Sequence, residues 1–456
     1  TKECEFYKNR WAMFTPIYAN SNLYEILTSI GGSAIYRWEP NAEEDEFGSK
    51  YRVAQTLTSG SGYWYKFENY FEDTYIVNPS GTVSTNPVVI QLNRGWNQIG
   101  NPYYYYINWD SCLINNFSPR AAEQQGLIQN AIYMYNRTDT GSYGYIRIPD
   151  ENANIDGYLK PYFGGWIYAN ANCELRYSNI PTVPNISYLD RAPNRFAPRR
   201  GSPQNWQIKF LVHTNETFDD QNYIGVVEDA SETNDKLDKY KAPVIANYAE
   251  LSFVGKVSEG AVSGNKKYAT DYRAQFDKYG EWDAVLSSDM KNTKITVRWE
   301  NIENLPENYV AYLQDLQSGE IIDMSVQSEY IIMTGNKRTQ RNFKIKIGDK
   351  EYAPLMFAVL NADSVYVYPN PIIVSQHGEN LKFRAENASD ITLKIYDISG
   401  EKVIEITAPL SGSEYTWNLR NGKGRRVASG VYLYILECRD SSGKTLTKRG
   451  KFAVIR

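Results

Sequence analysis

The sequence is poor in histidine. Its 456 residues include only two histidines, His213 and His377. Histidine is the usual general base near neutral pH. Neither histidine lies in the context of a nucleophile motif, and the sequence contains no G-x-S-x-G. A carboxylate pair can be assembled from distant positions, but no pair is nominated by the sequence. We therefore expect a protein that is not an enzyme.

Long apolar runs and an excess of one charge are also absent. No stretch approaches the ~20 apolar residues that a membrane-spanning helix needs. The 49 basic and 53 acidic residues give a net charge of −4, which lacks the basic signature of a nucleic-acid-binding protein. The sequence begins at Thr1 without an initiator methionine or an apolar leader. An exported protein of this kind would have lost its leader or been cut from a larger precursor.

Cysteine is scarce and its spacing is uninformative. The four cysteines lack the spacing of a metal site and allow three pairings, none of which the sequence selects. One disulfide among Cys4, Cys112 and Cys173 fits an exported protein. Four buried or free thiols, including that of Cys438, fit as well.

Tyrosine, in contrast, is abundant, with 38 residues in a chain whose aromatic content is 14%. A tyrosine ring is apolar with a polar tip, so it suits both half-buried β-sheets and contact surfaces for carbohydrate or protein. The chain is also too long for one ordinary core, which predicts three or four domains.

An internal repeat occupies the first 180 residues. The segment around Trp11 recurs around Trp96, Ala34–Trp38 recurs as Ala131–Tyr135, and the strand with Trp64 recurs as the strand with Trp166. We therefore predict two homologous β-rich units, 1–88 and 89–180. A short helix is predicted in each after its first strand, over 22–30 and 109–115, with asparagine at or before the first turn.

Two further segments follow the repeats. Five prolines punctuate 181–203, which predicts a linker. Alternating β-rich runs then predict a sandwich over 204–360, with strands at Trp206–Val212, Lys294–Trp299, Tyr309–Leu316 and Asn342–Ile347.

The last segment, 361–456, reads as a small all-β module. It contains Tyr-Pro-Asn-Pro (368–371), IYDISGEKV (395–403), GKGRRVASGVYLY (422–434) and a closing basic-apolar strand. Turn dipeptides at Ser399-Gly400 and Asn421-Gly422 separate its strands. These elements resemble the Ig-like family of the flagellar hook-capping protein and the C-terminal sorting domain of type IX secretion substrates. The order of motifs in the repeats, and the 204–360 sandwich, also resemble modules found beside such sorting domains.

The fold class that we expect is therefore all-β: Ig-like β-sandwich domains in series, with a few short helices. The resemblance implies export, an extracellular or bacterial cell-surface location, and a final module that meets the secretion and attachment machinery. No chemistry is implied by it.

Two candidate sites remain. An acidic stretch containing Asp219, Asp220, Asp229, Asp235 and Asp238 could supply the oxygen ligands of calcium, although it lacks the EF-hand spacing and its glycine. A solvated acidic loop is the alternative. The run Tyr103, Tyr104, Tyr105 and Tyr106, with Trp109, has no counterpart in the first repeat and could contact a glycan or a protein partner.

The sequence thus predicts a non-catalytic, extracellular structural or adhesive protein. Its partners would be other surface proteins or copies of itself, and edge strands could build a layer or filament. One alternative is the non-catalytic C-terminal portion of a larger secreted hydrolase. Another is a carbohydrate-binding accessory protein.

Overall fold

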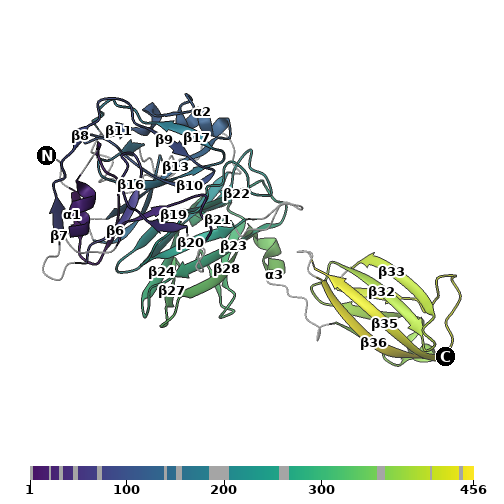
Figure 1. Ribbon diagram of the computed structural model, residues 1–456. Coiled ribbons are helices and arrows are strands. Elements are labelled where there is room, and N and C mark those ends of the chain that lie inside the picture. Colours follow the sequence, from purple (N-terminus) through teal and green to yellow (C-terminus); the bar gives the residue numbers. More distant parts are fainter. Residues whose placement is uncertain are drawn as a thin grey trace. The chain divides into compact units, whose positions relative to one another are not determined.

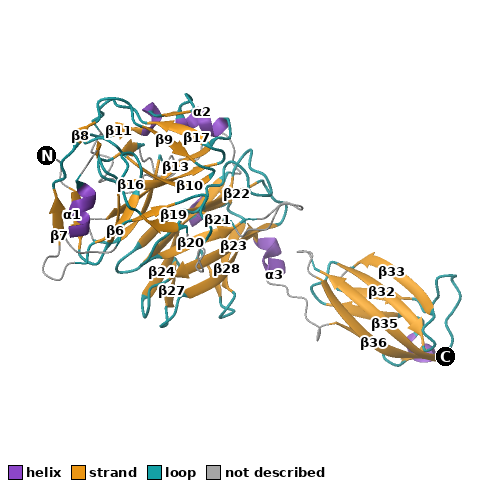
Figure 2. Cartoon of the chain, in the orientation of Figure 1, coloured by secondary structure: helices purple, strands orange, loops and turns teal. Residues whose placement is uncertain are grey.

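The structure, a computed structural model, describes residues 4–19, 22–29, 34–44, 50–68, 74–137, 141–149, 157–183, 205–255, 266–356, 365–410, 413–440 and 445–456. These residues form an all-β protein whose strands dominate the cartoon (Figures 1 and 2). The chain divides into two compact units, Thr1–Asp349 and Lys350–Arg456. Most of the expected linker, 184–203, lies outside the described residues.

The first repeat has a four-stranded sheet of order β2-β6-β4-β5 and two strand pairs, β1-β7 and β3-β8. Its elements are β1 (Cys4–Tyr7), β2 (Trp11–Phe14), β3 (Tyr18–Ala19), α1 (Leu23–Ser29), β4 (Tyr36–Trp38), β5 (Tyr51–Val53), β6 (Tyr63–Lys66), β7 (Thr74–Val77) and β8 (Thr82–Val83). Helix α1 confirms the helix predicted over 22–30, and its buried Leu23 and Leu27 face the core of this repeat.

The second repeat has a four-stranded sheet of order β10-β16-β13-β14, with smaller sheets β12-β17-β9 and β11-β15. Its strands are β9 (Val89–Leu92), β10 (Gly95–Gly100), β11 (Ile107–Asn108), β12 (Leu113–Ile114), β13 (Ile128–Arg137), β14 (Tyr143–Ile148), β15 (Tyr158–Leu159), β16 (Gly164–Ala169) and β17 (Cys173–Arg176). The helix expected over 109–115 is a single 3₁₀ turn, η1 (Trp109–Ser111), capped by the side chain of Asn108. A second helix, α2 (Pro119–Gln124), was not predicted.

The two repeats match in register as well as in strand order. In the first, Met13 of β2 lies opposite Trp64 of β6, and Tyr36 of β4 also pairs with Trp64. In the second, Gln98 of β10 and Tyr133 of β13 pair with Trp166 of β16.

The repeats also bind each other reciprocally. Phe14 of the first forms an antiparallel bridge with Phe163 of the second, and Ile99 of the second forms the equivalent bridge with Ser61 of the first. Such an exchange is the arrangement of a two-fold symmetric pair. It requires small residues, because a Cβ on Gly62 would lie 2.8 Å from the carbonyl oxygen of Ile99.

The third unit is a β-sandwich of two sheets, β22-β19-β18-β24-β27 and β21-β20-β23-β28-β25-β26. Its elements are β18 (Trp206–His213), β19 (Phe218–Val226), β20 (Ala249–Val254), β21 (Lys267–Tyr268), β22 (Thr270–Arg273), β23 (Tyr279–Ser288), β24 (Lys294–Glu300), η3 (Ile302–Asn304), β25 (Tyr309–Asp315), β26 (Ile321–Asp323), β27 (Glu329–Met333) and β28 (Thr339–Asp349). All four strands predicted from alternation are present. Burial alternates strictly along β23, as expected for a strand with one face on a core.

The unit Lys350–Arg456 contains two sheets, β29-β31-β34 and β30-β36-β35-β32-β33. Its elements are η4 (Lys350–Tyr352), α3 (Ala353–Met356), β29 (Val365–Tyr368), β30 (Ile372–Ile373), α4 (Val374–His377), β31 (Leu381–Ala385), β32 (Asp390–Asp397), β33 (Lys402–Pro409), β34 (Glu414–Trp417), β35 (Gly430–Arg439) and β36 (Thr445–Ile455). A separate core that includes Trp417, Leu436 and Phe452 fills the space between its strands.

The segments expected as 1–88, 89–180 and 204–360 share one compact unit as far as Asp349. The division lies between Asp349 and Lys350, before the expected boundary at 360/361. Among the helices that the structure describes, none has the length and apolarity to cross a membrane.

Candidate functional site

Aromatic side chains gather where three parts of residues 1–349 meet: the two repeats and the β-sandwich that follows them. The rings of Trp38 and Trp166, from different repeats, lie edge to face with centroids 5.3 Å apart. Those of Trp64 and Tyr135 are 4.8 Å apart. Aromatic pairs in this geometry stabilise an interface beyond the area that they bury. This cluster accounts for part of the tyrosine excess as interior packing rather than ligand contact.

The third unit joins the repeats through the segment 238–247. The ring of Tyr240 lies 4.4 Å from that of Tyr168, and its carbonyl oxygen accepts a 2.8 Å hydrogen bond from the hydroxyl of Tyr133. Tyr145 donates to the carbonyl oxygen of Pro243 at 2.6 Å. Because these tyrosine hydroxyls are satisfied across the boundary, the phenol groups can be buried at little cost.

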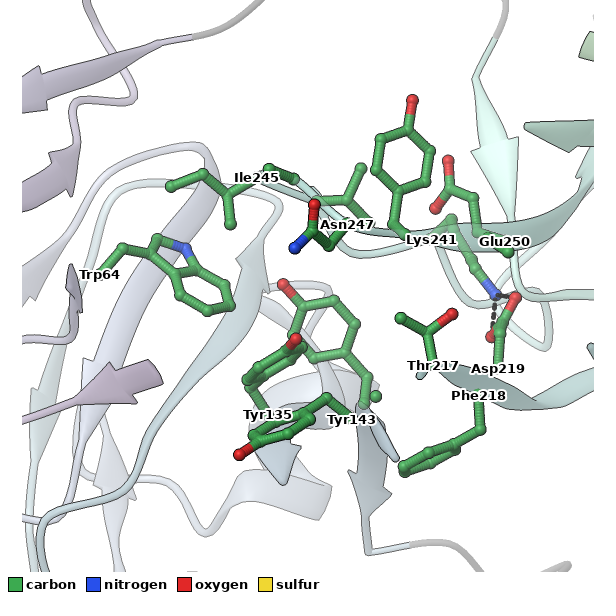
Figure 3. Close-up of a pocket in the computed structure, with 16 residues that line it drawn as sticks. Trp64, Tyr135, Tyr143, Thr217, Phe218, Asp219, Lys241, Ile245, Asn247 and Glu250 are labelled. Carbon is green, nitrogen blue, oxygen red and sulfur yellow. Dashed lines mark hydrogen bonds and ion pairs between the residues drawn. The ribbon is translucent and has the colours of Figure 1, made fainter. Parts of the chain in front are cut away.

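A small pocket remains at this junction (Figure 3). Trp64, Tyr135 and Tyr143 lie on one side of it, and Thr217, Asp219 and Lys241 on the other. Its volume is about 40 Å³, which holds roughly one to three water molecules. A pocket of that size is too small for an organic ligand.

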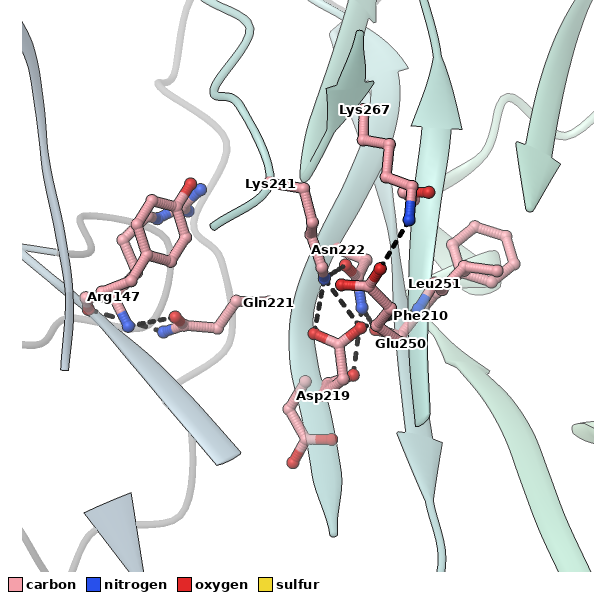
Figure 4. A network of polar contacts seen from close by, with 12 residues as sticks. Arg147, Phe210, Asp219, Gln221, Asn222, Lys241, Glu250, Leu251 and Lys267 are labelled. Carbon is pink, nitrogen blue, oxygen red and sulfur yellow. Dashed lines mark hydrogen bonds and ion pairs between the residues drawn. The ribbon is translucent and has the colours of Figure 1, made fainter. Parts of the chain in front are cut away.

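An ion pair between Asp219 and Lys241 lines this pocket (Figure 4). The Lys241 ammonium lies 2.6 and 2.7 Å from the two carboxylate oxygens and also contacts the amide oxygen of Asn222. The backbone N–H of Leu251 donates to the same carboxylate at 2.8 Å. Burial raises the pKa of Asp219, and the charge and hydrogen bonds of Lys241 oppose that shift. Asp219 is therefore committed to an internal cation.

The other candidate calcium ligands lie in different surroundings. Asp220 binds the imidazole of His213 at 2.5 Å. Asp229 is exposed in a turn with a φ of 70°. Asp235 and Asp238 accept backbone N–H groups, and burial raises the pKa of Asp238 to about 7.

This placement does not bring together the five aspartates that were expected to bind calcium. The residues that the structure describes contain no group of three or more His, Cys, Asp or Glu side chains placed to hold a metal ion. The five aspartates are close in sequence, but β19 and the following turns send them to different partners. Closeness in the sequence therefore did not indicate that these side chains meet at one point in the structure.

The aromatic run expected to contact a glycan is also largely internal. Tyr103 is 1% exposed, and its hydroxyl accepts from the backbone N–H of Val88 at 2.9 Å. Trp109 is fully buried, and its indole N–H donates to Asn130 at 2.8 Å. These two residues belong to the core of the second repeat.

Of the remaining tyrosines in the run, Tyr104 is the most open, with 43% of its surface exposed. Tyr105 stacks on Tyr103 at 5.1 Å and donates to the carbonyl oxygen of Asn179. Tyr106 is half-buried. The run precedes β11 and does not lie on a strand. A single exposed ring offers little surface for a sugar to stack on.

The cysteines whose side chains are described are reduced. Cys112, Cys173 and Cys438 are free and buried, so neither Cys112 nor Cys173 takes part in the disulfide considered above. Burial raises the pKa of Cys112 to about 12 and that of Cys438 to about 11. These thiols behave as packing groups. The side chain of Cys4 lies outside the described residues.

No protein-family model matches the chain, and no curated protein matches it.

Similar solved structures cover parts of the chain. PorZ of Porphyromonas gingivalis, a bacterial surface component of the type-IX secretion system, is 27% identical over 28% of this chain and 15% of its own, with a TM-score of 0.17. Dimeric latent PorU of the same organism is 12% identical over 78% of this chain and 34% of its own, with a TM-score of 0.17. A tetra-tandem repeat from the extending region of a large adhesion protein is 8% identical over 71% of this chain and 91% of its own, with a TM-score of 0.19. The chain thus spans well under two thirds of both Porphyromonas proteins, and likenesses of this size carry no functional information.

Proposed function

We propose that the protein is a non-catalytic structural or adhesive protein of a bacterial cell surface. In this proposal, 1–349 is the working body, and the module 365–456 directs export and provides the attachment point. The single observation that carries the proposal is that side chains of the motif residues in the last module form the hydrogen bonds that hold its turns and its two ends together. The motif residues therefore share a structural role within the module, which supports the proposal.

Asn370, in the Tyr-Pro-Asn-Pro motif, fastens the start of the module to its last strand. Its amide N–H donates to the carbonyl oxygen of Lys451 at 3.0 Å, and its amide oxygen accepts from the backbone N–H of Ala453 at 3.2 Å. Both partners lie in β36. Hydrogen bonds thus join the opening motif to the closing strand. These two elements of the resemblance stand at opposite ends of the module's sequence.

The two turn motifs are closed by side chains in the same way. Asp397 accepts hydrogen bonds from the backbone N–H groups of Ser399 and Glu401, and Gly400 supplies a φ of 87°. Asn421 accepts from the backbone N–H of Lys423 and of Arg425. These are the Asx-type turns that set hairpin geometry.

Secretion of the full-length chain tests the proposal. We expect a protein that contains residues 1–456, expressed behind a secretion leader in a bacterium with a type IX system, to reach the surface and become sensitive to added protease. A version lacking 365–456 should be made at the same level and remain protected inside the cell. Equal surface exposure of the two versions would refute the export role.

The same cells address the alternative that this chain is part of a larger hydrolase. Intact-mass and N-terminal analysis of the native surface protein should find no catalytic region ahead of Thr1. A catalytic region there would contradict the purely structural role and give this chain an accessory role in a hydrolase.

A further inference from the structure

A lysine, an asparagine and an aspartate meet inside the third unit (Figure 4). The ammonium of Lys241, in the segment 238–247, contacts the side-chain oxygen of Asn222 as well as both carboxylate oxygens of Asp219. We propose that Lys241 and Asn222 join in an intramolecular isopeptide bond, with Asp219 as the acid–base group. The lysine nitrogen replaces the amide nitrogen of the asparagine, and ammonia leaves.

The carboxamide of Asn222 is held in position for attack by the lysine. Asn222 lies opposite Phe210 in the pairing of β19 with β18, and Phe210 belongs to the core of the sandwich. Since opposite residues share a face of the sheet, the asparagine side chain points into this core, where it is fully buried. Its amide group donates to the backbone carbonyl oxygens of Asp219 at 3.0 Å and of Phe210 at 3.3 Å. Those two bonds turn its oxygen toward the lysine.

The nucleophile is held as firmly as the carboxamide. The backbone N–H of Lys241 donates to the carbonyl oxygen of Lys267 at 2.9 Å, and only 8% of the Lys241 side chain is exposed. The amine therefore stays against the carboxamide for the lifetime of the fold. Well-aligned groups within one molecule react as if one of them were present at about 10⁵–10⁸ M, which makes a slow amide exchange feasible.

Asp219 moves the protons of the reaction. Its carboxylate takes one proton from the lysine ammonium, and the free amine then attacks Cγ of Asn222, forming the new C–N bond. The protonated Asp219 gives its proton to Nδ2 and takes the second proton from the lysine nitrogen. The bond between Cγ and Nδ2 breaks, and ammonia leaves with its electron pair. Lys241 ends as a neutral amide and Asp219 as a neutral acid, so charge and electrons balance.

Burial favours these products over the reactants. An ion pair inside a protein keeps two charges away from water, which is costly, whereas an amide and a protonated acid carry no charge. Burial also raises the pKa of Asp219, in line with an acid that holds its proton at the end of the reaction. The pocket lined by Asp219 and Lys241 has a volume of about 40 Å³, enough to receive a departing molecule the size of water. The ion pair is thus the reactant of this step, and loss of either partner also prevents the bond.

Mass spectrometry of the full chain, after unfolding in acid, tests the proposal. We expect the wild type to be lighter than its sequence by one ammonia, and trypsin to release the peptide 210–236 joined to the peptide 240–256. Lys241→Met and Asp219→Asn should each have the mass of their sequence and yield the two peptides separately. Because a covalent bond survives unfolding, the wild-type result does not depend on how well either variant folds.

The matched control is Lys239→Met, which changes a second ion-paired lysine of the same segment. Lys239 pairs with Glu123 at 2.6 Å, so its partner is a carboxylate and not a carboxamide. This variant should still lose one ammonia and still yield the joined peptides. Separate peptides from it would show that Lys241 does not react by itself and would contradict the assignment.

Three results for the wild type would overturn the proposal. An unaltered mass after prolonged incubation would reduce the three side chains to a structural ion pair. Loss of water in place of ammonia would put the bond on the Asp219 carboxyl group. Loss of ammonia without joined peptides would indicate cyclisation of an asparagine on its own backbone. Since the three side chains lie within 1–349, none of these outcomes affects the export role of 365–456.

Discussion

Replacing Trp166 by alanine should destabilise the whole body 1–349 and leave the last module unchanged. Trp166 is fully buried between the repeats. Its ring contacts those of Trp38 and Trp96, and its indole N–H donates to the hydroxyl of Tyr145 at 2.9 Å. The substitution therefore empties the centre of the contact that joins the repeats.

The magnitude follows from the burial. A fully buried tryptophan truncated to alanine costs about 3–5 kcal/mol, and the lost hydrogen bond adds about 1 kcal/mol. Because Tyr145 still donates to Pro243, its hydroxyl is not left unsatisfied. For a unit of this size, the urea dependence of the free energy of unfolding is on the order of 3 kcal/mol per molar or more, so the midpoint should fall by roughly 1–2 M.

Urea unfolding followed by far-ultraviolet circular dichroism measures the effect, and two transitions are expected from the two compact units. The matched control is Trp417→Ala, which removes an equally buried tryptophan from the core of the last module. It should move only the other transition. A shift below about 1 kcal/mol for Trp166→Ala, or a separate early transition of the repeats alone, would refute the single cooperative body.

Three further predictions concern individual side chains. Lys241→Met should destabilise the protein by about 3–5 kcal/mol, because it leaves Asp219 buried without its cation, and adding Asp219→Leu should restore much of the loss in a double-mutant cycle; additive losses would show that the pair is not coupled. The hydrogen bond to Asp220 raises the pKa of His213, so the imidazole stabilises the fold fully below its unfolded pKa of about 6.5 and progressively less as pH rises through the folded value. His213→Gln should therefore lower the melting temperature more at pH 5.5 than at pH 8.5, and an equal effect at both would contradict the ion pair. Because burial raises the pKa of Cys112 to about 12, its thiol should resist alkylation at pH 8 until urea unfolds the protein, as mass spectrometry of labelled peptides can show.

The sequence predicted the strands and the repeat well because both are encoded locally. Alternation along Lys294–Trp299 and turn residues such as Gly400 depend on neighbours within a few positions. The equivalence of Trp64 and Trp166 then predicted two matching sheets, and the registers agree residue by residue. Helix α2 was missed although its signal was present, since Ser118 caps it and Pro119 occupies its first turn.

Side chains whose roles depend on distant partners could not be predicted in this way. Asp219 forms an ion pair with Lys241, but in the sequence it is only one residue of an acidic stretch. Tyr103 is buried because its hydroxyl meets the backbone of Val88, which no local rule indicates.

The reciprocal bridges between the repeats, Phe14 with Phe163 and Ser61 with Ile99, have a consequence for assembly. Two separate subunits related in this way would dissociate on dilution. Within one chain the contact is intramolecular, so its strength is set by an effective concentration and does not depend on how much protein is present. Its self-complementary surface is also already occupied. Further copies of the chain would have to join through other surfaces, and a head-to-tail contact between two unlike surfaces would build rings or open filaments.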